Sequence, residues 1–224
     1  MLSNKKILIT AGPTWEAIDP IRGITNHSSG KMGYAIAEKA FRLGANVKLV
    51  SGPVCLSPPA GVETIQVLSA LDMYEAVHRQ LETNDIDIFV GVAAVADYRP
   101  ANVHSQKFKK SSTELTLKLV RNPDIITSVA ALKVGRPYTV AFAAETENLQ
   151  TYAFKKLVNK KLDMIIANDV SKLGTGFGTD QNQVLMITHE QTIDSGKQDK
   201  LELANTILLH ISKHLETYES NRTS

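Results

Sequence analysis

The sequence predicts an α/β protein with a mainly parallel central sheet. Short apolar runs rich in branched residues alternate with longer segments whose apolar residues recur at helical spacing. The run Ile86–Val92 is almost continuously apolar, as expected of a central parallel strand covered on both faces. The chain has 224 residues, 43% hydrophobic and 21% charged, which is enough to bury a large core. We therefore expect a single α/β domain over residues 1–224.

The expected strands are short and apolar, and turn residues follow several of them. They cover Lys6–Thr10, Val47–Val50, Val62–Val67, Ile86–Val92, Tyr138–Ala143, Met164–Ala167 and Val184–Thr188. The expected helices carry an apolar stripe or begin at a residue that favours a helix start. They cover Met32–Leu43, Ser69–Leu81, Pro123–Leu132, Leu149–Leu162 and Lys200–Leu215, with Ser69 as an N-cap and Pro123 in a first turn.

One later segment has a different pattern. Residues Glu114–Val120 alternate polar and apolar side chains, which is typical of a strand with one face in water. Together with the preceding basic run Lys107–Lys110, this segment is expected to form a hairpin arm added to the sheet.

Composition excludes several classes of protein. The formal net charge is +2, so no strong basic field is available for binding nucleic acid. Cys55 is the only cysteine, which rules out an intrachain disulfide and is typical of a reducing compartment. No apolar run approaches the length of a signal sequence or a membrane span. We expect a cytoplasmic protein that binds neither nucleic acid nor a membrane.

The first candidate ligand site is the long segment Ala11–Gly33, which joins the first strand to the first helix. Near its end, Ser28, Ser29 and Gly30 bring hydroxyl and N–H groups to the positive end of that helix. Such an arrangement favours phosphate. The alternative is that one of the two serines merely caps the helix, and both interpretations stay open.

This segment matches neither common nucleotide-binding motif. In a dinucleotide-binding domain, Gly-x-Gly-x-x-Gly follows the first strand tightly and an acidic residue follows the second strand. Here the first strand leads into Ala11-Gly12-Pro13-Thr14 and the second into Ser51-Gly52. Lys31 also lacks the upstream glycine and the following Ser or Thr of a Walker A loop. A nicotinamide-dependent dehydrogenase is therefore disfavoured.

The segment Gly91–Pro100 follows the predicted central strand. Its small residues leave room for a flat ligand, and Asp97 has the chemistry to bind ribose hydroxyls or a magnesium ion. The alternative is a turn in which Asp97 pairs with Arg99.

Two later regions carry further polar residues. The run Lys107–Lys110 is either a solvated face or, through one lysine, a clamp for polyphosphate. Asn122-Pro123-Asp124 turns into a helix start, and Phe142 is expected in the core. Lys156 and Lys160 share a helix face, which is ordinarily solvated. No Ser–His–acid arrangement stands out.

Seven blocks occur in order along the chain. They are AGPTWEAIDPIRGITNHSSGKMG, SGPV, GVAAVADYRP, KFKK, RNPDI, FAAET and IANDV. Together, from Ile7 to Val170, they resemble the bacterial phosphopantothenate–cysteine ligase family, also called phosphopantothenoylcysteine synthetases. In many bacteria this unit follows a flavin-dependent decarboxylase domain. Nothing resembling that domain precedes the first strand, so a free-standing ligase is expected.

The resemblance implies a Rossmann-like three-layer fold and a reaction in two steps. The carboxylate of 4′-phosphopantothenate attacks the α-phosphorus of CTP, which releases pyrophosphate and leaves an acyl-cytidylate. The amine of L-cysteine then attacks the acyl carbon, which gives phosphopantothenoylcysteine and CMP. Mg²⁺ assists. Such a reaction needs charge neutralisation and positioning more than acid–base groups.

The resemblance also implies roles for individual residues. Asn26 is expected to orient the acyl-cytidylate, Lys107 to stabilise charge in the nucleotide step, and Asp97 to lie near the ribose or the metal ion. The other positions expected to contact the nucleotide or its phosphates are Ser28, Ser29, Gly30, Gly91, Val92, Ala93, Pro123, Asp124, Ile125, Ile126, Phe142, Lys156 and Lys160.

Two positions depart from the family pattern. Trp15 stands where relatives carry a charged residue and is assigned no role, and Phe108 replaces an aliphatic residue. Family members are dimers in which the basic arm covers the neighbour's site. We therefore expect a homodimer with Glu114–Val120 in its interface, and a separate decarboxylase as a further partner.

Two other functions stay open at this point. An NAD(P)-binding reductase on a similar sheet rests on the order of strands and helices alone. A nucleotide-binding regulator without catalytic activity rests on phosphate-type loops that lack a catalytic base.

Overall fold

The structure is a computed structural model, and it describes residues 2–107, 115–145, 147–169 and 181–223. Its central sheet has eight strands in the order β13-β12-β10-β9-β6-β1-β4-β5. These strands are β1 (Lys6–Ala11), β4 (Asn46–Ser51), β5 (Glu63–Gln66), β6 (Ile88–Gly91), β9 (Tyr138–Glu145), β10 (Met164–Asp169), β12 (Val184–Ile187) and β13 (Thr192–Asp194). From β10 to β5 all neighbours pair in parallel, whereas β12 and β13 add an antiparallel edge.

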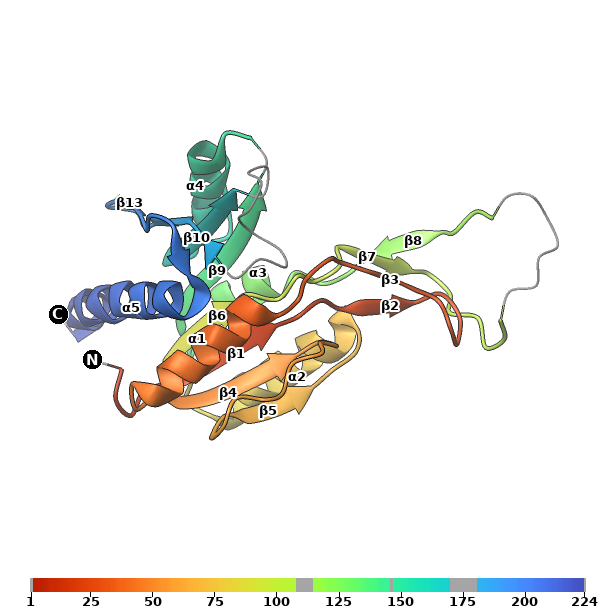
Figure 1. Cartoon of the computed structure of the whole chain (residues 1–224), viewed down its shortest axis with the longest axis horizontal. Helices are drawn as coiled ribbons and strands as arrows, with labels where there is room; N and C mark the ends of the chain where they lie inside the picture. Colours follow the sequence, from red (N-terminus) through yellow and green to blue (C-terminus); the bar gives the residue numbers. More distant parts are fainter. Residues whose placement is uncertain (1, 108–114, 146, 170–180, 224) are drawn as a thin grey trace.

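Helices cover both faces of this sheet (Figure 1). They are α1 (Lys31–Arg42), α2 (Ala70–Thr83), α3 (Ile125–Ala130), α4 (Leu149–Asn159) and α5 (Lys200–Thr223). Helices α1 and α5 share one core with the strands, in which Ile36 and Ile207 pack over Ile9. On the opposite face α2 and α3 pack over Leu8 and Phe89, and α4 packs beside them. The expected three-layer α/β arrangement is therefore confirmed.

Local sequence signals explain several element boundaries. All four residues of β6 are buried, in agreement with a central strand. Ser69 caps α2 as expected: its Oγ accepts from the Asp72 N–H at 3.1 Å, and its own N–H donates to Asp72 Oδ2 at 2.8 Å. Helix α3 starts one residue later than its cap, Asp124. Pro123 therefore precedes the cap, and its expected place in the first turn is wrong.

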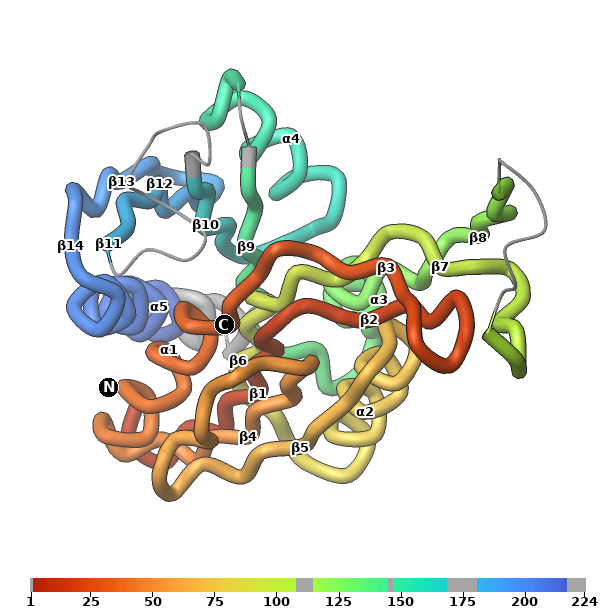
Figure 2. The backbone as a smooth tube through the Cα atoms, turned by 45° about the vertical axis from the view of Figure 1, so that its right-hand side comes forward, coloured from red at the N-terminus to blue at the C-terminus, as the bar shows by residue number. Residues whose placement is uncertain are grey.

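Two hairpins leave the carboxyl edge of the sheet side by side (Figures 1 and 2). The first pairs β2 (Trp15–Ala17) with β3 (Gly23–Thr25), and the second pairs β7 (Tyr98–Pro100) with β8 (Leu119–Arg121). We call these two hairpins the arm. The turn between β2 and β3 is closed by the buried carboxylate of Asp19, which accepts the backbone N–H groups of Ile21 and Arg22.

The hairpin arm expected around Glu114–Val120 is present, but its expected addition to the central sheet is wrong, and Glu114 itself lies outside the described residues. Strand β8 covers Leu119–Arg121 and pairs with β7 outside the central sheet. The reason is topological: β6 already has β1 and β9 as neighbours, so the segments after it have no position beside it. Of the basic run, Lys107 lies on the arm, and residues 108–110 lie outside the described residues.

Within the described part of the chain, none of the helices combines the length and the apolar composition needed to cross a bilayer.

Candidate functional site

A cavity of about 660 Å³ lies where α1 begins and where β6, β9 and β10 end. This is the edge at which parallel α/β sheets usually bind ligands. Its walls come from segments far apart in the sequence. They are Gly12, residues 26–33, residues 92–95, Asp97, residues 142–144, Lys156, Asn168, Asn182 and Lys200.

The start of α1 forms one wall and lacks a side-chain cap. Its N-cap is Gly30, whose φ of 75° belongs to the left-handed region that glycine adopts without strain. Ser28 Oγ accepts the Gly30 N–H at 3.4 Å, and the N-cap makes no side-chain capping bond. The alternative in which a serine caps this helix is therefore wrong. The first turn instead presents N–H groups and a positive dipole to the cavity.

Asn26 lies beside this helix start, at the end of the first hairpin. Its Nδ2 donates to the Ala94 carbonyl oxygen at 2.9 Å, which ties the first loop to the segment after β6. The Ala94 N–H in turn donates to the Gly12 carbonyl oxygen at 2.9 Å. Backbone groups therefore hold the Asn26 amide at the cavity wall, and its Oδ1 is available to a ligand.

Asp97 contributes a carboxylate to the cavity. The alternative in which it pairs with Arg99 is wrong, because the Arg99 guanidinium donates to the Arg121 carbonyl oxygen at 2.7 Å and to Asn122 Oδ1 at 3.0 Å. The Asp97 side chain is exposed and lines the cavity, while its backbone carbonyl accepts the Asn122 N–H at 2.8 Å. Its carboxylate is thus one of the polar groups in the cavity lining.

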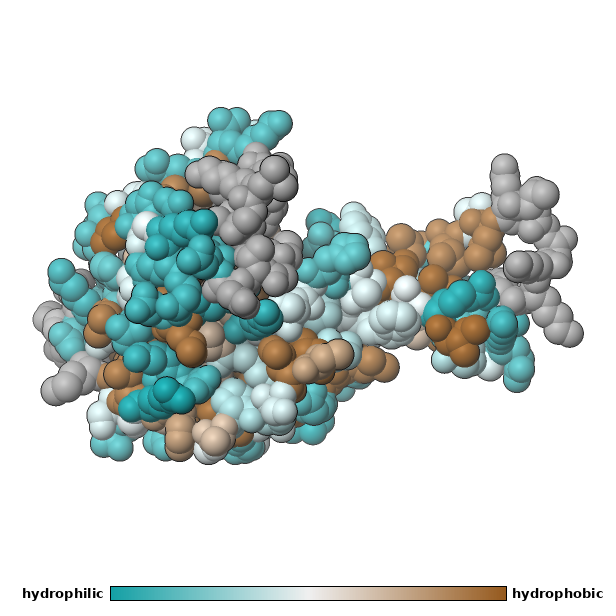
Figure 3. Space-filling view, viewed as in Figure 1, coloured by the Kyte–Doolittle hydropathy of each residue, from teal (hydrophilic) through white to brown (hydrophobic). Residues whose placement is uncertain are grey.

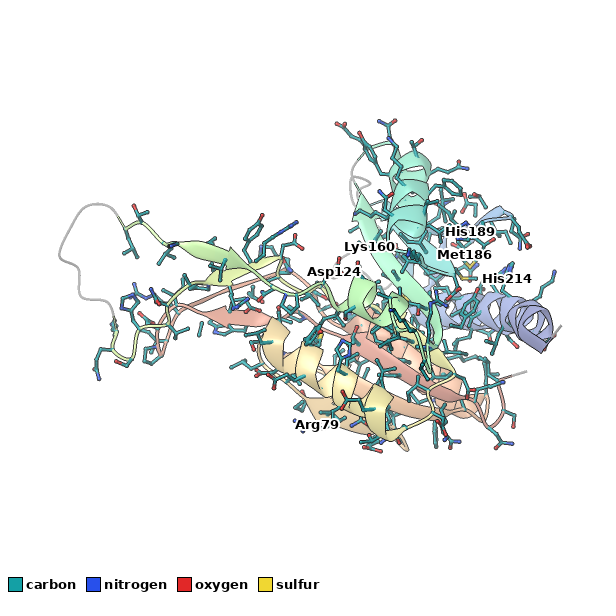
Figure 4. The ribbon with its side chains drawn as sticks, turned by 180° about the vertical axis from the view of Figure 1, so that it is seen from behind. Arg79, Asp124, Lys160, Met186, His189 and His214 are labelled. Carbon is teal, nitrogen blue, oxygen red and sulfur yellow. The ribbon has the colours of Figure 1, made fainter. Side chains whose placement is uncertain are left out.

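The two lysines of α4 have different surroundings. Lys156 lines the cavity, whereas Lys160 binds Asp124 Oδ2 at 2.7 Å, outside the cavity lining (Figure 4). Burial opposes ionisation of Asp124. The hydrogen bonds from Lys160 and from the Thr127 N–H outweigh it, so the pKa of this carboxyl is lowered.

The remaining expected residues also fall into two groups, those that line the cavity and those that do not. Val92, Ala93, Phe142 and the loop Ser28–Gly30 line the cavity. Gly91 and residues 123–126 do not line it; a Cβ at Gly91 would lie 2.8 Å from Ile126 Cγ1, so this glycine packs against α3. Lys107 is exposed on the arm and contributes nothing to the cavity of its own chain.

Several lining residues are absent from the expected site, among them Lys31, Asn168, Asn182 and Lys200. Lys31 and Asn168 lie inside two of the seven blocks, at the end of the first block (SSGKMG) and in IANDV, so the resemblance could have pointed to them. Asn168 Oδ1 is buried and has no hydrogen-bond partner among the described residues, which leaves an acceptor in the cavity wall. No local sequence pattern marks Asn182 or Lys200 as site residues, because only the fold brings them to the cavity wall.

The described residues contain no group of three His, Cys, Asp or Glu side chains arranged to hold a metal ion. Magnesium is commonly bound by one or two carboxylates together with substrate phosphates. A single carboxylate, that of Asp97, is therefore compatible with a magnesium ion whose other ligands are the phosphates of a bound polyphosphate.

Comparison with known proteins gives concordant results. A model of the DNA/pantothenate metabolism flavoprotein C-terminal domain matches residues 2–215. The coenzyme A biosynthesis bifunctional protein CoaBC of Vibrio vulnificus (strain YJ016) is 57% identical over 187 residues, covering 83% of this chain and 46% of that protein. The chain thus spans about half the length of the curated relatives it matches.

Solved structures share the fold. A crystal structure of the C-terminal domain of a coenzyme A biosynthesis bifunctional protein CoaBC has a TM-score of 0.82 and 45% identity, and the match covers 96% of this chain and 98% of that one. A Cab2 variant in complex with phosphopantothenate-cysteine has a TM-score of 0.80 over 99% of this chain and 89% of that one. At 15% identity, the second structure supports the fold alone.

We predict a small, pH-dependent coupling between Asp124 and Lys160. Both side chains are partly exposed, so a double-mutant cycle with Asp124→Asn and Lys160→Met should give about 0.5–1 kcal/mol at neutral pH. Because the folded pKa of Asp124 is lowered, this stabilisation is present above its unfolded pKa of about 4 and is lost as the pH falls through the folded value. Urea unfolding from pH 7 to pH 2 measures it. A coupling that persists at pH 2 would contradict the assignment.

Proposed function

The chain belongs to the DNA/pantothenate metabolism flavoprotein C-terminal domain family, and we propose that it joins 4′-phosphopantothenate to L-cysteine at the expense of CTP. One observation carries this proposal: Asn26 and Ser28–Gly30, Asp97, Phe142 and Lys156, from four separate segments, line one cavity. The name of the CoaBC relatives, coenzyme A biosynthesis bifunctional protein, supports the same chemistry.

In the first step the substrate carboxylate attacks the α-phosphorus of CTP, and pyrophosphate leaves. The start of α1 and the cavity lysines offset the negative charge that gathers there. Asn26 holds the acyl-cytidylate through its amide, so the acyl carbon stays in place for the second step. The cysteine amine then attacks that carbon, loses a proton, and CMP leaves.

Magnesium, when bound, neutralises part of the triphosphate charge, and Asp97 is the carboxylate in the cavity that would hold it. Phe142 lies next to Ala143 and Ala144 in the wall, where small side chains leave room for the base.

The proposal includes a homodimer in which the arm of one copy reaches the cavity of the other. Several apolar side chains on the arm are exposed. They are Ile21, Tyr98, Val103, Leu115 and Leu119. Figure 3 shows apolar surface along the projecting arm. Burial of this surface in a dimer would bring the neighbour's Lys107 to the nucleotide.

A cytoplasmic location and a decarboxylase that acts on the product complete the proposal. The exposed Cys55 thiol is compatible with a reducing compartment, and the word bifunctional in the relatives' name supports a second enzyme in the same sequence of reactions.

The proposal is tested by a nucleotide panel. Purified protein is mixed with 4′-phosphopantothenate, L-cysteine and Mg²⁺, together with CTP, UTP, ATP or GTP. Cysteine-dependent formation of CMP and pyrophosphate is expected with CTP. Tight NADPH binding without CTP turnover would instead favour the reductase, and CTP binding without consumption would favour the regulator.

We predict that Asn26→Ala lowers kcat by about 10²- to 10³-fold, as loss of one positioning or oxyanion contact does in other enzymes. The free energy of unfolding should change little, because the side chain is exposed and makes one hydrogen bond, to the Ala94 carbonyl oxygen. Turnover and urea unfolding are measured on the same preparation. An unchanged kcat would show that Asn26 does not orient the intermediate.

We predict that Leu119→Glu converts a dimer to a monomer, because it places a charge in the apolar surface of the arm. Val134→Glu is the matched control, since Val134 is an exposed apolar residue between α3 and β9, away from the arm. Analytical ultracentrifugation measures the oligomeric state of the wild type and of both variants. A monomeric wild-type protein, or a dimer that survives Leu119→Glu, would refute the interface.

A mixture of inactive variants tests whether sites are shared between copies. If each site combines Asn26 of one copy with Lys107 of the other, mixing Asn26→Ala with Lys107→Met restores about a quarter of the sites after subunit exchange. No recovery would place both residues on one chain.

A further inference from the structure

The backbone of residues 96 and 97 is held from two sides by residues far away in the sequence. On one side, Thr14 Oγ1 accepts the Ala96 N–H at 3.0 Å. On the other side, Asn122 Nδ2 donates to the Ala96 carbonyl oxygen at 2.8 Å, and the Asn122 N–H donates to the Asp97 carbonyl oxygen at 2.8 Å. Three hydrogen bonds therefore fix the backbone that carries the Asp97 carboxylate, although the Asp97 side chain itself is exposed.

Asn122 makes two of these three bonds, and Arg99 sets the orientation of its amide. The Arg99 guanidinium donates to Asn122 Oδ1 at 3.0 Å and to the Arg121 carbonyl oxygen at 2.7 Å. A guanidinium has donors only, so the amide oxygen of Asn122 must face Arg99, and its NH₂ group must face the Ala96 carbonyl. The Asn122 side chain is therefore held by hydrogen bonds at both of its polar atoms.

The hydrophobic core in turn sets the position of Asn122. This residue directly follows β8 and lies two positions before Asp124, the N-cap of α3. Ile125 and Val129 of α3 are buried in the core that this helix forms with α2 and the sheet. Asn122 itself lies outside the cavity lining. It therefore connects a packed helix to the backbone beneath a cavity residue without occupying the cavity.

A fixed backbone at Asp97 matters most for a metal ion. Of the described side chains that line the cavity, Asp97 carries the only carboxylate. Magnesium requires near-ideal octahedral geometry and takes most of its ligands from water and phosphate, so a single protein carboxylate has to be well placed. Residues that orient a metal-binding carboxylate through hydrogen bonds typically change metal affinity by about 10- to 100-fold.

We propose that Asn122 is a positioning residue for the magnesium-bound nucleotide. By fixing the backbone of residues 96 and 97, it places the Asp97 carboxylate for the ion that accompanies the triphosphate. Asn122 acts through Asp97 and contacts neither the ion nor the nucleotide. This inference rests on the proposed function.

The test uses Asn122→Leu, which has nearly the shape of asparagine and neither its donor nor its acceptor. Asn84→Leu is the matched control, because Asn84 Nδ2 also donates to a backbone carbonyl, that of Gln80 at 3.1 Å, at the end of α2 and outside the cavity lining. Calorimetry measures binding of CTP with and without Mg²⁺, in the absence of the acid and of cysteine.

Asn122→Leu should weaken binding of CTP in the presence of Mg²⁺ by about 10- to 100-fold, and it should change binding of CTP alone by less than about twofold. Asn84→Leu should match the wild type in both measurements. Equal weakening of CTP with and without Mg²⁺, or no weakening at all, would overturn the proposal.

A double-mutant cycle shows whether Asn122 acts through Asp97. Asp97→Asn removes the charge of the carboxylate and should weaken binding of CTP with Mg²⁺ at least as much as Asn122→Leu does. If Asn122 acts through Asp97, Asn122→Leu has no further effect in the Asp97→Asn background. Losses that add in the double variant would assign Asn122 to general structure and overturn the proposal.

Hydrogen exchange of the ligand-free protein gives a readout that needs no nucleotide. Asn122→Leu should raise the exchange rates of the amides in residues 92–97 by about tenfold, because it removes one of the bonds that hold this segment. The amides of the buried strand β6 should exchange as in the wild type. Unchanged rates in residues 92–97 would overturn the proposal, and so would faster exchange with unchanged binding of CTP and Mg²⁺.

These outcomes separate the inference from the proposed function. A wild-type protein that binds CTP with Mg²⁺ and forms no product overturns the proposed function, and the binding comparison still decides the role of Asn122. Binding of CTP that does not respond to Mg²⁺ overturns this inference alone if product forms, and both proposals if it does not. Urea unfolding accompanies each variant. If Asn122→Leu does not fold, Asn122→Ala removes the same donor without added bulk and should show the same selective loss.

Discussion

The close contact between α1 and β1 sets the geometry of the whole site. A Cβ at Gly33 would lie 2.6 Å from the Ala11 Cβ, so a larger residue there would push the helix away from the strand. Because β1 lies between β6 and β4 inside the sheet, this contact brings the start of α1 to the ends of the central strands. The uncapped first turn, the Asn26 amide and the loop after β6 then meet in one cavity.

The chemistry of this cavity follows from charge more than from proton transfer. Lysines and helix N–H groups surround it, and Asp97 supplies a single carboxylate among the lining residues. The Lys160 ammonium group binds Asp124, the cap of α3, and so stabilises the helix that packs behind Gly91.

The arm has two features that contacts within one chain do not account for. Its two hairpins project from the sheet with apolar side chains in water, and Lys107 lies on it away from the cavity. A second copy would bury this surface and bring Lys107 to a cavity whose own chain does not supply that residue. The homodimer proposed here thus gives one reason for both features.

The sequence by itself determined the order of strands and helices, the central position of β6, the cap of α2 and the loop at the start of α1, because these follow from local patterns of polarity and capping. It also singled out Asn26, Asp97 and Phe142 through family blocks. Only the tertiary structure decided that Lys156 faces the cavity while Lys160 pairs with Asp124, and that the arm leaves the sheet instead of extending it. Only the tertiary structure placed Lys200 in the wall, because packing of α5 on α1 joins residues about 170 positions apart, and no local pattern records such a contact.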